Sequence, residues 1–353
     1  MVYDIAVVGA GPAGSVFARQ MADSGRSILL IDGQDERRKK PCGGLLAPDA
    51  QKVLAHFDLT LPKSVLADPQ IFSVKTIDLG KKTVRYYQRY YMNMDRYAFD
   101  RWLLSLVPNH VTLYSGRCLA IDKQDGLFQL TVHNGQQSQC FQSRQIVGAD
   151  GANSVVRKTF FHTQPMQYVA IQQWFHSNSQ STPFYSRIFD PETSESCSWL
   201  MYKDDAVIYG GCFLPQGCRQ SFEAQKRRLA DFLGNDFGSP VKTEACLVDR
   251  PKHFRDFVMG ENGVYLVGEA AGLISASSFE GISSAILSGS LLANAFFTSG
   301  SDKKIAKRYR RMTRKLRLKL YAKIKKRWFM YTPWVRRLIM KTGVDSIQVQ
   351  HTE

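Results

Sequence analysis

Three short glycine-rich segments lie far apart in the chain and have the composition of turns that bind phosphate groups. The first is residues 9–14 (GAGPAG), the second is 148–151 (GADG), and the third, 268–272 (GEAAG), is followed by 280–282 (EGI). Glycine lets main-chain N–H groups approach a ligand closely, and a helix that starts at such a turn attracts anions at its N-terminus. In this order, the three segments predict a protein wrapped around one dinucleotide.

The first segment has the sequence context of a strand, a turn and a helix. Residues 5–8 form an apolar run, and residues 16–21 have helical periodicity. In this setting Gly9 permits the tight turn, Gly11 lets the backbone reach a pyrophosphate, and Gly14 lets the helix pack closely on the strand. The residues expected to bind the dinucleotide here are Gly9, Gly11, Pro12, Ala13 and Gly14.

An acidic residue stands where a dinucleotide-binding unit needs one. A second apolar run, residues 27–31, ends in Asp32, about 20 residues after the glycines. A carboxylate at this position binds the hydroxyl groups of the adenosine ribose. Asp32 is therefore assigned to the cofactor site.

The second and third segments distinguish a flavin from a nicotinamide. With them the sequence resembles the flavoproteins of the aromatic hydroxylase type, which bind FAD. The resemblance implies that Asp150, with Arg157 nearby, contacts the FAD pyrophosphate region. It also implies that the later loop holds the ribityl chain and the flavin ring, through Gly268, Glu269, Gly281 and Ile282. Glu269 stands where that family usually has aspartate.

A closer resemblance is carried by residues 40–45 (KPCGGL) and by 94–96 (MDR) with Phe99 and Asp100. These segments resemble the geranylgeranyl reductase family, flavoproteins that reduce prenyl lipids. The resemblance implies that Cys42, Gly43 and Gly44 lie beside the isoalloxazine and that Arg96 meets the cofactor. It favours a catalytic role for Cys42, as a proton donor or a shield of the flavin face, and the alternative is a small buried residue that packs against the ring. Leu119 is assigned to the same cofactor site, and no metal ligands are predicted. Within the family, one branch shares the longer runs 41–51, 168–175 and 313–320.

The flavin ring leaves two reaction classes open. In a reductase, an isolated prenyl double bond passes through a transition state with cationic character, which aromatic faces stabilise. Trp199 and then Trp174 are the residues predicted to bind such a substrate, although residues 197–202 (CSWLMY) keep only the tryptophan of the family's Tyr-x-Trp-x-Phe-Pro strand. The alternatives are a flavin monooxygenase acting on a hydrophobic or aromatic metabolite, and a flavoprotein that binds a lipid carrier without catalysis. No Trp-x-Trp-x-Ile-Pro segment supports a halogenase.

Only one dinucleotide fingerprint is visible, so the electron donor stays undecided. NAD(P)H would have to bind transiently, and a reduced ferredoxin or flavodoxin is the other donor considered. Such acidic proteins would be attracted by a basic surface.

Length and pattern predict an α/β protein of about two domains. The chain has 353 residues, of which 44% are apolar, which is enough to bury substantial cores. The prediction is a Rossmann-type FAD-binding domain of the hydroxylase and glutathione-reductase type, a second antiparallel-sheet substrate domain, and a basic helical C-terminal tail. The FAD-binding domain is assigned residues 1–65, 93–165 and 249–302, the substrate domain 66–92 and 166–248, and the tail 303–353.

The cysteines and the apolar run at 282–300 help to predict the cellular compartment of the protein. Seven cysteines without a CxxC pair, and no basic leader before the first strand, favour reduced thiols in a cytoplasm. The run 282–300 is uncharged but rich in Ser, Gly and Ala, and it follows the predicted flavin loop. We therefore expect a buried helix there, not a membrane span.

The positive charge of the chain is concentrated in its tail. Residues 303–341 contain 17 Lys and Arg and no Asp or Glu, while the whole chain has a formal net charge of +16. Apolar residues recur there every three or four positions, which predicts an amphipathic helix ending at Pro333. Its apolar stripe either docks on the body of the protein or lies on an anionic membrane surface at the inner face of the membrane. The aromatic residues at 328–334 favour the membrane, and nucleic acid is an unlikely partner.

Overall fold

The computed structural model describes residues 1–33, 40–177, 182, 184–342 and 346–347. The chain divides into two units. Unit 1 comprises Met1–Lys39, Phe99–Met166 and Val248–Ile324, and unit 2 comprises Lys40–Ala98, Gln167–Leu247 and Lys325–Glu353. Each unit is built from segments that are distant in the sequence.

Unit 1 contains a sheet whose central strands are parallel. Its order is β15-β16-β9-β1-β2-β6, and a hairpin of β7 and β8 pairs with β9. Strands β16, β1 and β2 and the last three residues of β9 consist mainly of buried apolar residues, as expected for a parallel sheet covered on both faces. The strands are β1 (Val2–Val8), β2 (Ile28–Asp32), β6 (Thr112–Ser115), β7 (Arg117–Gln124), β8 (Leu127–His133), β9 (Ser138–Gly148), β15 (Gly260–Glu261) and β16 (Val264–Leu266).

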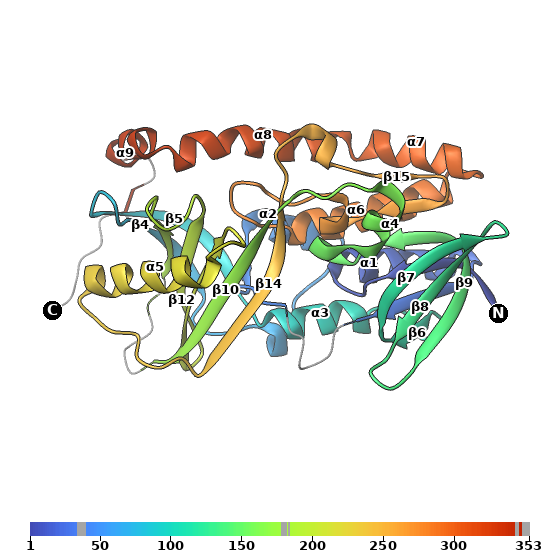
Figure 1. The fold of residues 1–353 in the computed structure, drawn as a ribbon, viewed down its shortest axis with the longest axis horizontal. Helices are drawn as coiled ribbons and strands as arrows, with labels where there is room; N and C mark the ends of the chain where they lie inside the picture. The colour runs from blue at the N-terminus through green and yellow to red at the C-terminus, as the bar shows by residue number, and fades with distance from the viewer. Residues whose placement is uncertain (34–39, 178–181, 183, 343–345, 348–353) are drawn as a thin grey trace. The chain divides into compact units, whose positions relative to one another are not determined.

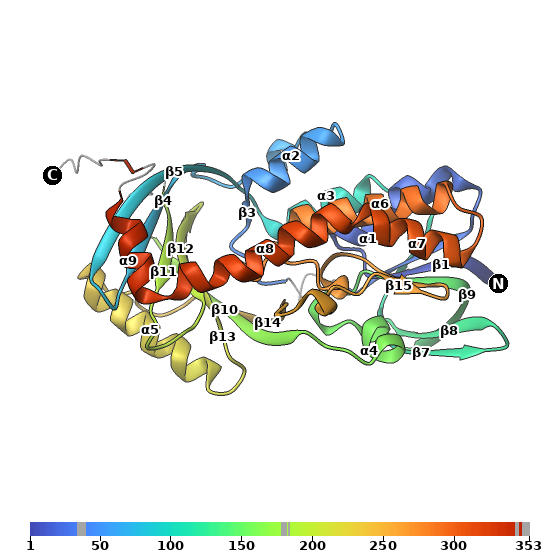
Figure 2. The same cartoon turned by 90° about the horizontal axis from the view of Figure 1, so that it is seen from above.

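Two helices of unit 1 pack tightly together. They are α1 (Pro12–Met21) and α6 (Ile282–Phe297), and α7 (Asp302–Met312) packs beside α6 (Figure 1; Figure 2). A Cβ on Gly289 of α6 would lie 2.4 Å from the carbonyl oxygen of Ala13. Only glycine therefore allows this approach. In the described part of the chain no helix is long and apolar enough to cross a membrane. Eight of the 16 residues of α6, which the sequence predicts as a buried helix, are buried.

The apolar stripe of the basic tail enters the core of unit 1. Ile305 and Tyr309 of α7 are buried, as are Leu316 and Leu320 of α8 (Arg314–Tyr331). The Tyr309 hydroxyl donates to the carbonyl oxygen of Leu266, at 3.0 Å. In this part of the tail, the apolar stripe docks on the body of the protein and does not lie on a membrane surface. The remaining described helices that touch unit 1 are α3 (Arg96–Ser105) and α4 (Val155–Phe161).

Unit 2 contains a second large sheet, in the order β14-β10-β13-β12-β11-β4-β5-β3. Its pairs are mainly antiparallel, although β4 and β11 run parallel. The strands are β3 (Leu45–Leu46), β4 (Ile71–Asp78), β5 (Thr83–Asn93), β10 (Met166–His176), β11 (Phe184–Phe189), β12 (Cys197–Lys203), β13 (Ala206–Phe213) and β14 (Lys242–Arg250), and the helices are α2 (Pro48–His56), α5 (Cys218–Leu233) and α9 (Pro333–Lys341).

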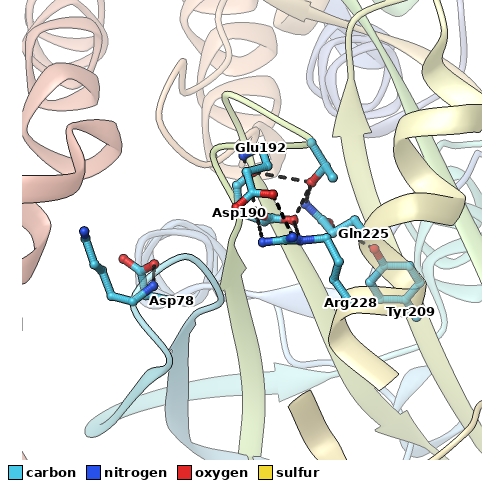
Figure 3. A network of polar contacts seen from close by, with 8 residues as sticks. Asp78, Asp190, Glu192, Tyr209, Gln225 and Arg228 are labelled. Carbon is cyan, nitrogen blue, oxygen red and sulfur yellow. Dashed lines mark hydrogen bonds and ion pairs between the residues drawn. The ribbon is translucent and has the colours of Figure 1, made fainter. Parts of the chain in front are cut away.

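Helix α5 covers one face of this sheet, where Phe222 and Leu229 pack on Tyr209 and Phe213. Polar contacts fix the helix further, as Figure 3 shows. The Arg228 guanidinium donates to Asp190 at 2.9 Å, and the Tyr209 hydroxyl donates to the Gln225 side chain at 3.0 Å. The opposite face of the sheet carries a separate cluster, which includes Val74, Tyr185, Met201 and Ile208.

The two units differ in extent from the predicted domains. Residues 40–65, assigned by sequence to the FAD-binding domain, group with unit 2, because β3 pairs with β5 and the amide of Met94 donates to the Gly44 carbonyl. The tail is divided after Ile324, since its stripe belongs to the core of unit 1. Hairpin 71–93 lies in unit 2, where the sequence places it.

Candidate cofactor and substrate sites

Strand register brings the three glycine-rich segments of unit 1 to one edge of the sheet. Val8 of β1 pairs with Ile31 of β2 and with Gly148 of β9, and Gly148 pairs with Leu266 of β16. All four strands are parallel, so their carboxyl ends meet. The turns that follow them begin the three predicted cofactor-binding segments, and Asp32 ends β2. Ligands bind at this edge of open α/β sheets.

The glycines of the first segment are required by close packing. Gly9 has φ of +105°, and a Cβ there would lie 2.4 Å from the Ala149 carbonyl oxygen. A Cβ on Gly14 would lie 1.9 Å from the Gly9 carbonyl oxygen. Gly11, by contrast, has no atom within 4 Å of the position its Cβ would take. The backbone is thus tightly packed behind the turn and open beside Gly11.

Asp32 is buried at the end of β2, with 4% of its side chain exposed. Arg101 of α3 donates to its Oδ2 at 2.6 Å. The arginine forms an ion pair with this carboxylate, whose oxygens can also accept hydrogen bonds from ribose hydroxyls. Sequence reasoning did not identify Arg101, because 69 residues separate it from its partner.

The Asp150 carboxylate lies at the N-terminus of α4. Its Oδ2 accepts from the amides of Val155 and Val156, at 2.7 and 3.3 Å. Its Oδ1 is buried and has no hydrogen-bond partner among the described residues. Burial raises the pKa of Asp150, while these hydrogen bonds lower it.

Arg157 braces the third segment. Its buried guanidinium donates to the carbonyl oxygens of Thr163, Ala270 and Asp256, at 3.1, 3.1 and 2.9 Å. Three of its donors therefore hold the loops beside the sheet edge.

The third segment forms a 3₁₀ turn, Gly268–Ala271, directly after β16. Glu269 is half-buried, and its Oε1 accepts from the Asp249 amide at 3.0 Å. Gly281 is the residue before the first turn of α6, and Ile282 begins the helix. Phe279, just before them, has φ of +54°, a conformation that costs a bulky side chain free energy.

The residues at this edge fit FAD. The first amides of α1 have no carbonyl partner within their own helix, and open space lies beside Gly11. These amides suit a pyrophosphate, Asp32 suits a ribose, and the unpartnered Oδ1 of Asp150 can accept one more hydrogen bond. Gly9, Gly11, Pro12, Ala13, Gly14 and Asp32 would hold the adenosine and pyrophosphate part of the group, with Asp150 at the pyrophosphate region. Gly268, Glu269, Gly281 and Ile282 would hold the ribityl chain and the flavin ring.

In unit 2 the Cys42–Gly44 loop packs on the sheet face opposite α5. A Cβ on Gly43 would lie 2.7 Å from the Met201 side chain and 3.8 Å from that of Trp199. The Gly44 amide donates to the Cys42 sulfur at 3.4 Å. The structure thus brings together two predictions that are distant in the sequence, the Cys42 loop and Trp199.

Trp199 lies flat over a glycine of the neighbouring strand. A Cβ on Gly210 would be 2.5 Å from its indole ring, and the indole Nε1 is buried with no partner among the described residues. Trp174 is on the same sheet face, but its Nε1 donates to Glu244 at 2.9 Å. Lys242 lies 5.6 Å from the Trp174 ring centroid. Trp174 is thus engaged by polar neighbours, whereas the Trp199 indole has an unused donor.

Lys203 is a buried group that sequence reasoning missed. Its ammonium donates to the Asn93 side chain at 2.7 Å and to the Met94 carbonyl. A Cβ on Gly44 would lie 2.5 Å from its Nζ. Burial lowers the pKa of Lys203 to about 8. The only sequence signal for it was a lysine at the end of the Trp199 strand.

Two further cofactor contacts, Arg96 and Leu119, stay predictions. Arg96 is the first residue of α3, is partly buried and belongs to unit 2. Leu119 is on β7 of unit 1 and is 52% exposed.

Comparison with known proteins agrees with the fold. Residues 3–165 match the family model for pyridine nucleotide-disulphide oxidoreductases. The chain is 43% identical to protein CbrA of Escherichia coli strain K12 over 350 residues, which is 98% of both chains. It is equally similar to CbrA of Shigella sonnei, 43% identical over 351 residues, again 98% of both chains.

Solved structures share the architecture at low sequence identity. A geranylgeranyl bacteriochlorophyll reductase-like protein from Thermoplasma acidophilum has a TM-score of 0.80 and 17% identity, covering 99% of this chain and 92% of that one. PqsL from Pseudomonas aeruginosa, described as a probable FAD-dependent monooxygenase, has a TM-score of 0.69 and 16% identity, covering 98% and 100%.

The fold, the sheet edge and the relatives lead to one conclusion. The predicted α/β class is confirmed, with a Rossmann-type FAD-binding domain and a second sheet domain. The branch that shares the long sequence runs is the one that contains CbrA. The chain therefore belongs to the CbrA family and is an FAD-dependent oxidoreductase.

Proposed function

We propose that this oxidoreductase saturates double bonds of a prenyl or polyprenyl lipid. The observation that carries the proposal is the packing of the Cys42–Gly44 loop against Trp199 in unit 2. FAD, when bound and reduced, supplies a hydride to one alkene carbon, and a proton is added to the other carbon. The likeness to a geranylgeranyl reductase-like fold supports the same chemistry.

The residues of unit 2 suit an apolar alkene. The Trp199 ring offers an aromatic face, on which positive charge that develops at an alkene carbon is stabilised. Met201 and Ile208 lie beside it and extend the apolar surface. Cys42 stands at the loop that covers this surface, where a small side chain leaves room for a reacting group.

The monooxygenase alternative is supported by the fold shared with PqsL. One experiment separates the two reactions. The purified protein, with its FAD chemically reduced, is incubated with geranylgeranyl phosphate with and without air, and the lipid is analysed by mass spectrometry. We expect products that gain pairs of hydrogen atoms in the absence of air. A product that gains oxygen, and only in air, would establish the monooxygenase, and unchanged lipid would count against both.

The electron donor follows from a second measurement on the same protein. NADPH, NADH and reduced ferredoxin are each mixed with the oxidised protein, and the loss of flavin absorbance is followed. We expect one of these donors to reduce the flavin faster than the others. Acidic ferredoxin would be the donor attracted by the basic tail, and its rate would then fall as salt is added.

We also propose that the C-terminal part of unit 2 rests on an anionic membrane surface. Four large apolar side chains are more than half exposed there: Trp328, Phe329, Trp334 and Leu338, at 56%, 51%, 64% and 60%. The Trp328 ring lies 5.0 Å from that of Phe329 and 6.3 Å from that of Trp334. We call these four residues the aromatic patch.

The other side of the same segment is anchored to the sheet of unit 2. Arg336 donates to the buried Asp78 at 2.7 Å, and the Tyr331 ring lies 5.5 Å from that of Phe189. The aromatic patch is therefore the outward face of an anchored segment. Exposed Lys325 and Lys326 lie next to it in the sequence, and tryptophan with lysine is the composition of membrane-surface helices.

Vesicle binding tests the membrane proposal. We expect the full-length protein to sediment with phosphatidylglycerol vesicles, to bind phosphatidylcholine vesicles weakly, and to be released as salt is raised. The Trp328→Ser/Trp334→Ser variant should lose about tenfold or more in binding. Phe72→Ser, which removes another ring that is 55% exposed in unit 2, is the control. Equal binding of all three proteins would contradict the role of the patch.

A further inference from the structure

One buried arginine of unit 2 lacks a counter-charge among the residues that the structure describes. Arg187 lies on β11, where it pairs across the sheet with Trp199, and only 8% of it is exposed. Its guanidinium lies 5.9 Å from the Tyr185 ring centroid. Among the described residues its side chain has no ion pair, and its buried Nε has no hydrogen-bond partner.

The other buried cations considered among the described residues each have hydrogen-bond acceptors, although the Nη2 of Arg336 is buried without one. Arg336 binds Asp78, Arg157 binds three carbonyl oxygens, Arg250 donates to the Ala276 carbonyl at 3.0 Å, and Lys203 binds Asn93 and Met94. Burial lowers the pKa of Arg187, and the groups that raise it are Tyr185, Cys197, Tyr87 and Tyr91, with no carboxylate among them. Arginine stays protonated in proteins.

Burying an unpaired charge has a large cost in free energy. Proteins tolerate such a group where a ligand supplies the missing partner. A guanidinium binds phosphate through paired, charge-assisted hydrogen bonds, so a phosphate is a suitable partner for Arg187.

The position of Arg187 on the sheet links it to the proposed substrate. Every second side chain of a strand points to the same face of the sheet, so Arg187 and Tyr185 are on the same face of β11. Tyr185 belongs to the cluster with Met201 and Ile208, which Trp199 packs against, whereas Ile188 faces α5. Arg187 and the apolar surface around Trp199 are therefore neighbours on one face of the sheet.

We propose that Arg187 binds the phosphate head group of the prenyl lipid, while the Trp199 surface holds the chain. This inference rests on the proposed function and specifies its substrate as an anionic lipid. The basic tail considered from sequence is not needed for this anchor.

Binding to the FAD-containing protein tests the inference without turnover. The affinities for geranylgeranyl phosphate, geranylgeraniol and inorganic phosphate are measured for the wild type, Arg187→Gln, Arg187→Lys and Arg227→Gln. Arg227 is the matched control, because it is exposed and lies on α5. We expect Arg187→Gln to weaken the affinity for geranylgeranyl phosphate by about 10- to 100-fold and to leave the affinity for geranylgeraniol unchanged. Arg187→Lys should retain part of the preference, and the control should match the wild type.

Thermal stability separates a binding role from a structural one. Removing an unpaired buried charge relieves its desolvation cost, so Arg187→Gln should melt at the same or a higher temperature than the wild type without ligand. A lower melting temperature of Arg187→Gln would overturn the inference. An equal loss of affinity for geranylgeranyl phosphate and for geranylgeraniol would also overturn it. So would a wild type that binds both lipids equally, a result that does not depend on any variant folding.

The remaining comparisons show whether the bound anion is a lipid phosphate or free phosphate. They also test the anion site and the proposed reductase activity separately. If inorganic phosphate binds as tightly as the phosphate lipid, the site takes free phosphate and the lipid assignment is wrong. If Arg187 selects the phosphate lipid but no reduction occurs in the anaerobic assay, the anion site stands and the reductase proposal falls. If both lipids are reduced with the same KM, and Arg187→Gln changes neither, the reductase stands and the anion site falls.

Discussion

A conservative replacement of Cys42 can test its role in the reaction separately from its role in FAD binding. Serine can also accept the hydrogen bond from the Gly44 amide, and the FAD-binding edge is built from unit 1. We therefore expect Cys42→Ser to keep its FAD, measured by absorbance, and to lose most lipid reduction in the anaerobic assay. Cys140→Ser, at an exposed cysteine of β9, is the control. Unchanged turnover in Cys42→Ser would remove Cys42 from the reaction.

Lys203 gives the protein a pH-dependent stability. The folded-state pKa of Lys203 is about 8, because burial disfavours the ammonium, whereas its ordinary value is 10.5. Between these values the unfolded chain binds more protons, so folding becomes more favourable as the pH rises. Relative to Lys203→Met, the free energy of unfolding should rise by about 3 kcal/mol from pH 8 to pH 10.5.

Chemical denaturation of both proteins at several pH values measures this difference. The variant removes the titrating group and keeps every other one, so the difference isolates Lys203. A constant offset between the two proteins across the whole range would show that Lys203 titrates normally in the folded state.

At the level of elements, the sheet of unit 2 holds Trp199 in place through one glycine on the next strand. The methyl group of Gly210→Ala would lie 2.5 Å from the indole, so the ring must move. We expect the variant to fold with its FAD, to show a shifted tryptophan fluorescence, and to lose affinity for geranylgeranyl phosphate. Gly238→Ala, in open space, tests whether any glycine replacement in unit 2 has this effect, although its positive φ adds some strain.

Helix α9 is held by a buried ion pair between Arg336 and Asp78, whose side chains are 6% and 1% exposed. Asp78→Asn leaves a buried arginine without its charge partner, which costs about 3–5 kcal/mol. Hydrogen–deuterium exchange should therefore increase in residues 333–341. Glu195→Gln breaks the more exposed pair with Arg327 and should cost about 1 kcal/mol or less. Equal effects of the two variants would show that burial of the pair does not anchor the helix.

Sequence reasoning succeeded where neighbours in the chain determine the structure. The turn at Gly9, the helix after it and Asp32 at the end of β2 are set by short-range patterns, and so is the polar and apolar alternation of residues 71–91, which predicts a hairpin and lies in β4 and β5. Arg101, Lys203 and Arg187 were not found. Their roles depend on strand register and on helix packing between distant segments, such as Lys203 with Asn93, which no local pattern encodes.

For the whole molecule, the discontinuity of both units explains which boundaries were hard to predict. Residues 40–65 follow directly from the first βαβ unit, so the sequence pattern gives no break there. Their membership is decided by pairing between β3 and β5, which is a contact across about 45 residues. The tail was predicted as one element, but its stripe enters the core of unit 1 only as far as Ile324.

The arrangement of unit 1 also sets an order of events during synthesis on the ribosome. Strand β16 pairs with β9, and α6 packs on α1 through Gly289. The FAD-binding edge therefore needs the first turn of the chain and residues near 297, which emerge last among its parts. A nascent chain that ends before β16 exposes the edge of β9 at residues 146–148 and the α6-binding side of α1, so it should be a substrate for chaperones. We expect FAD to be captured only after nearly the whole protein has left the ribosome.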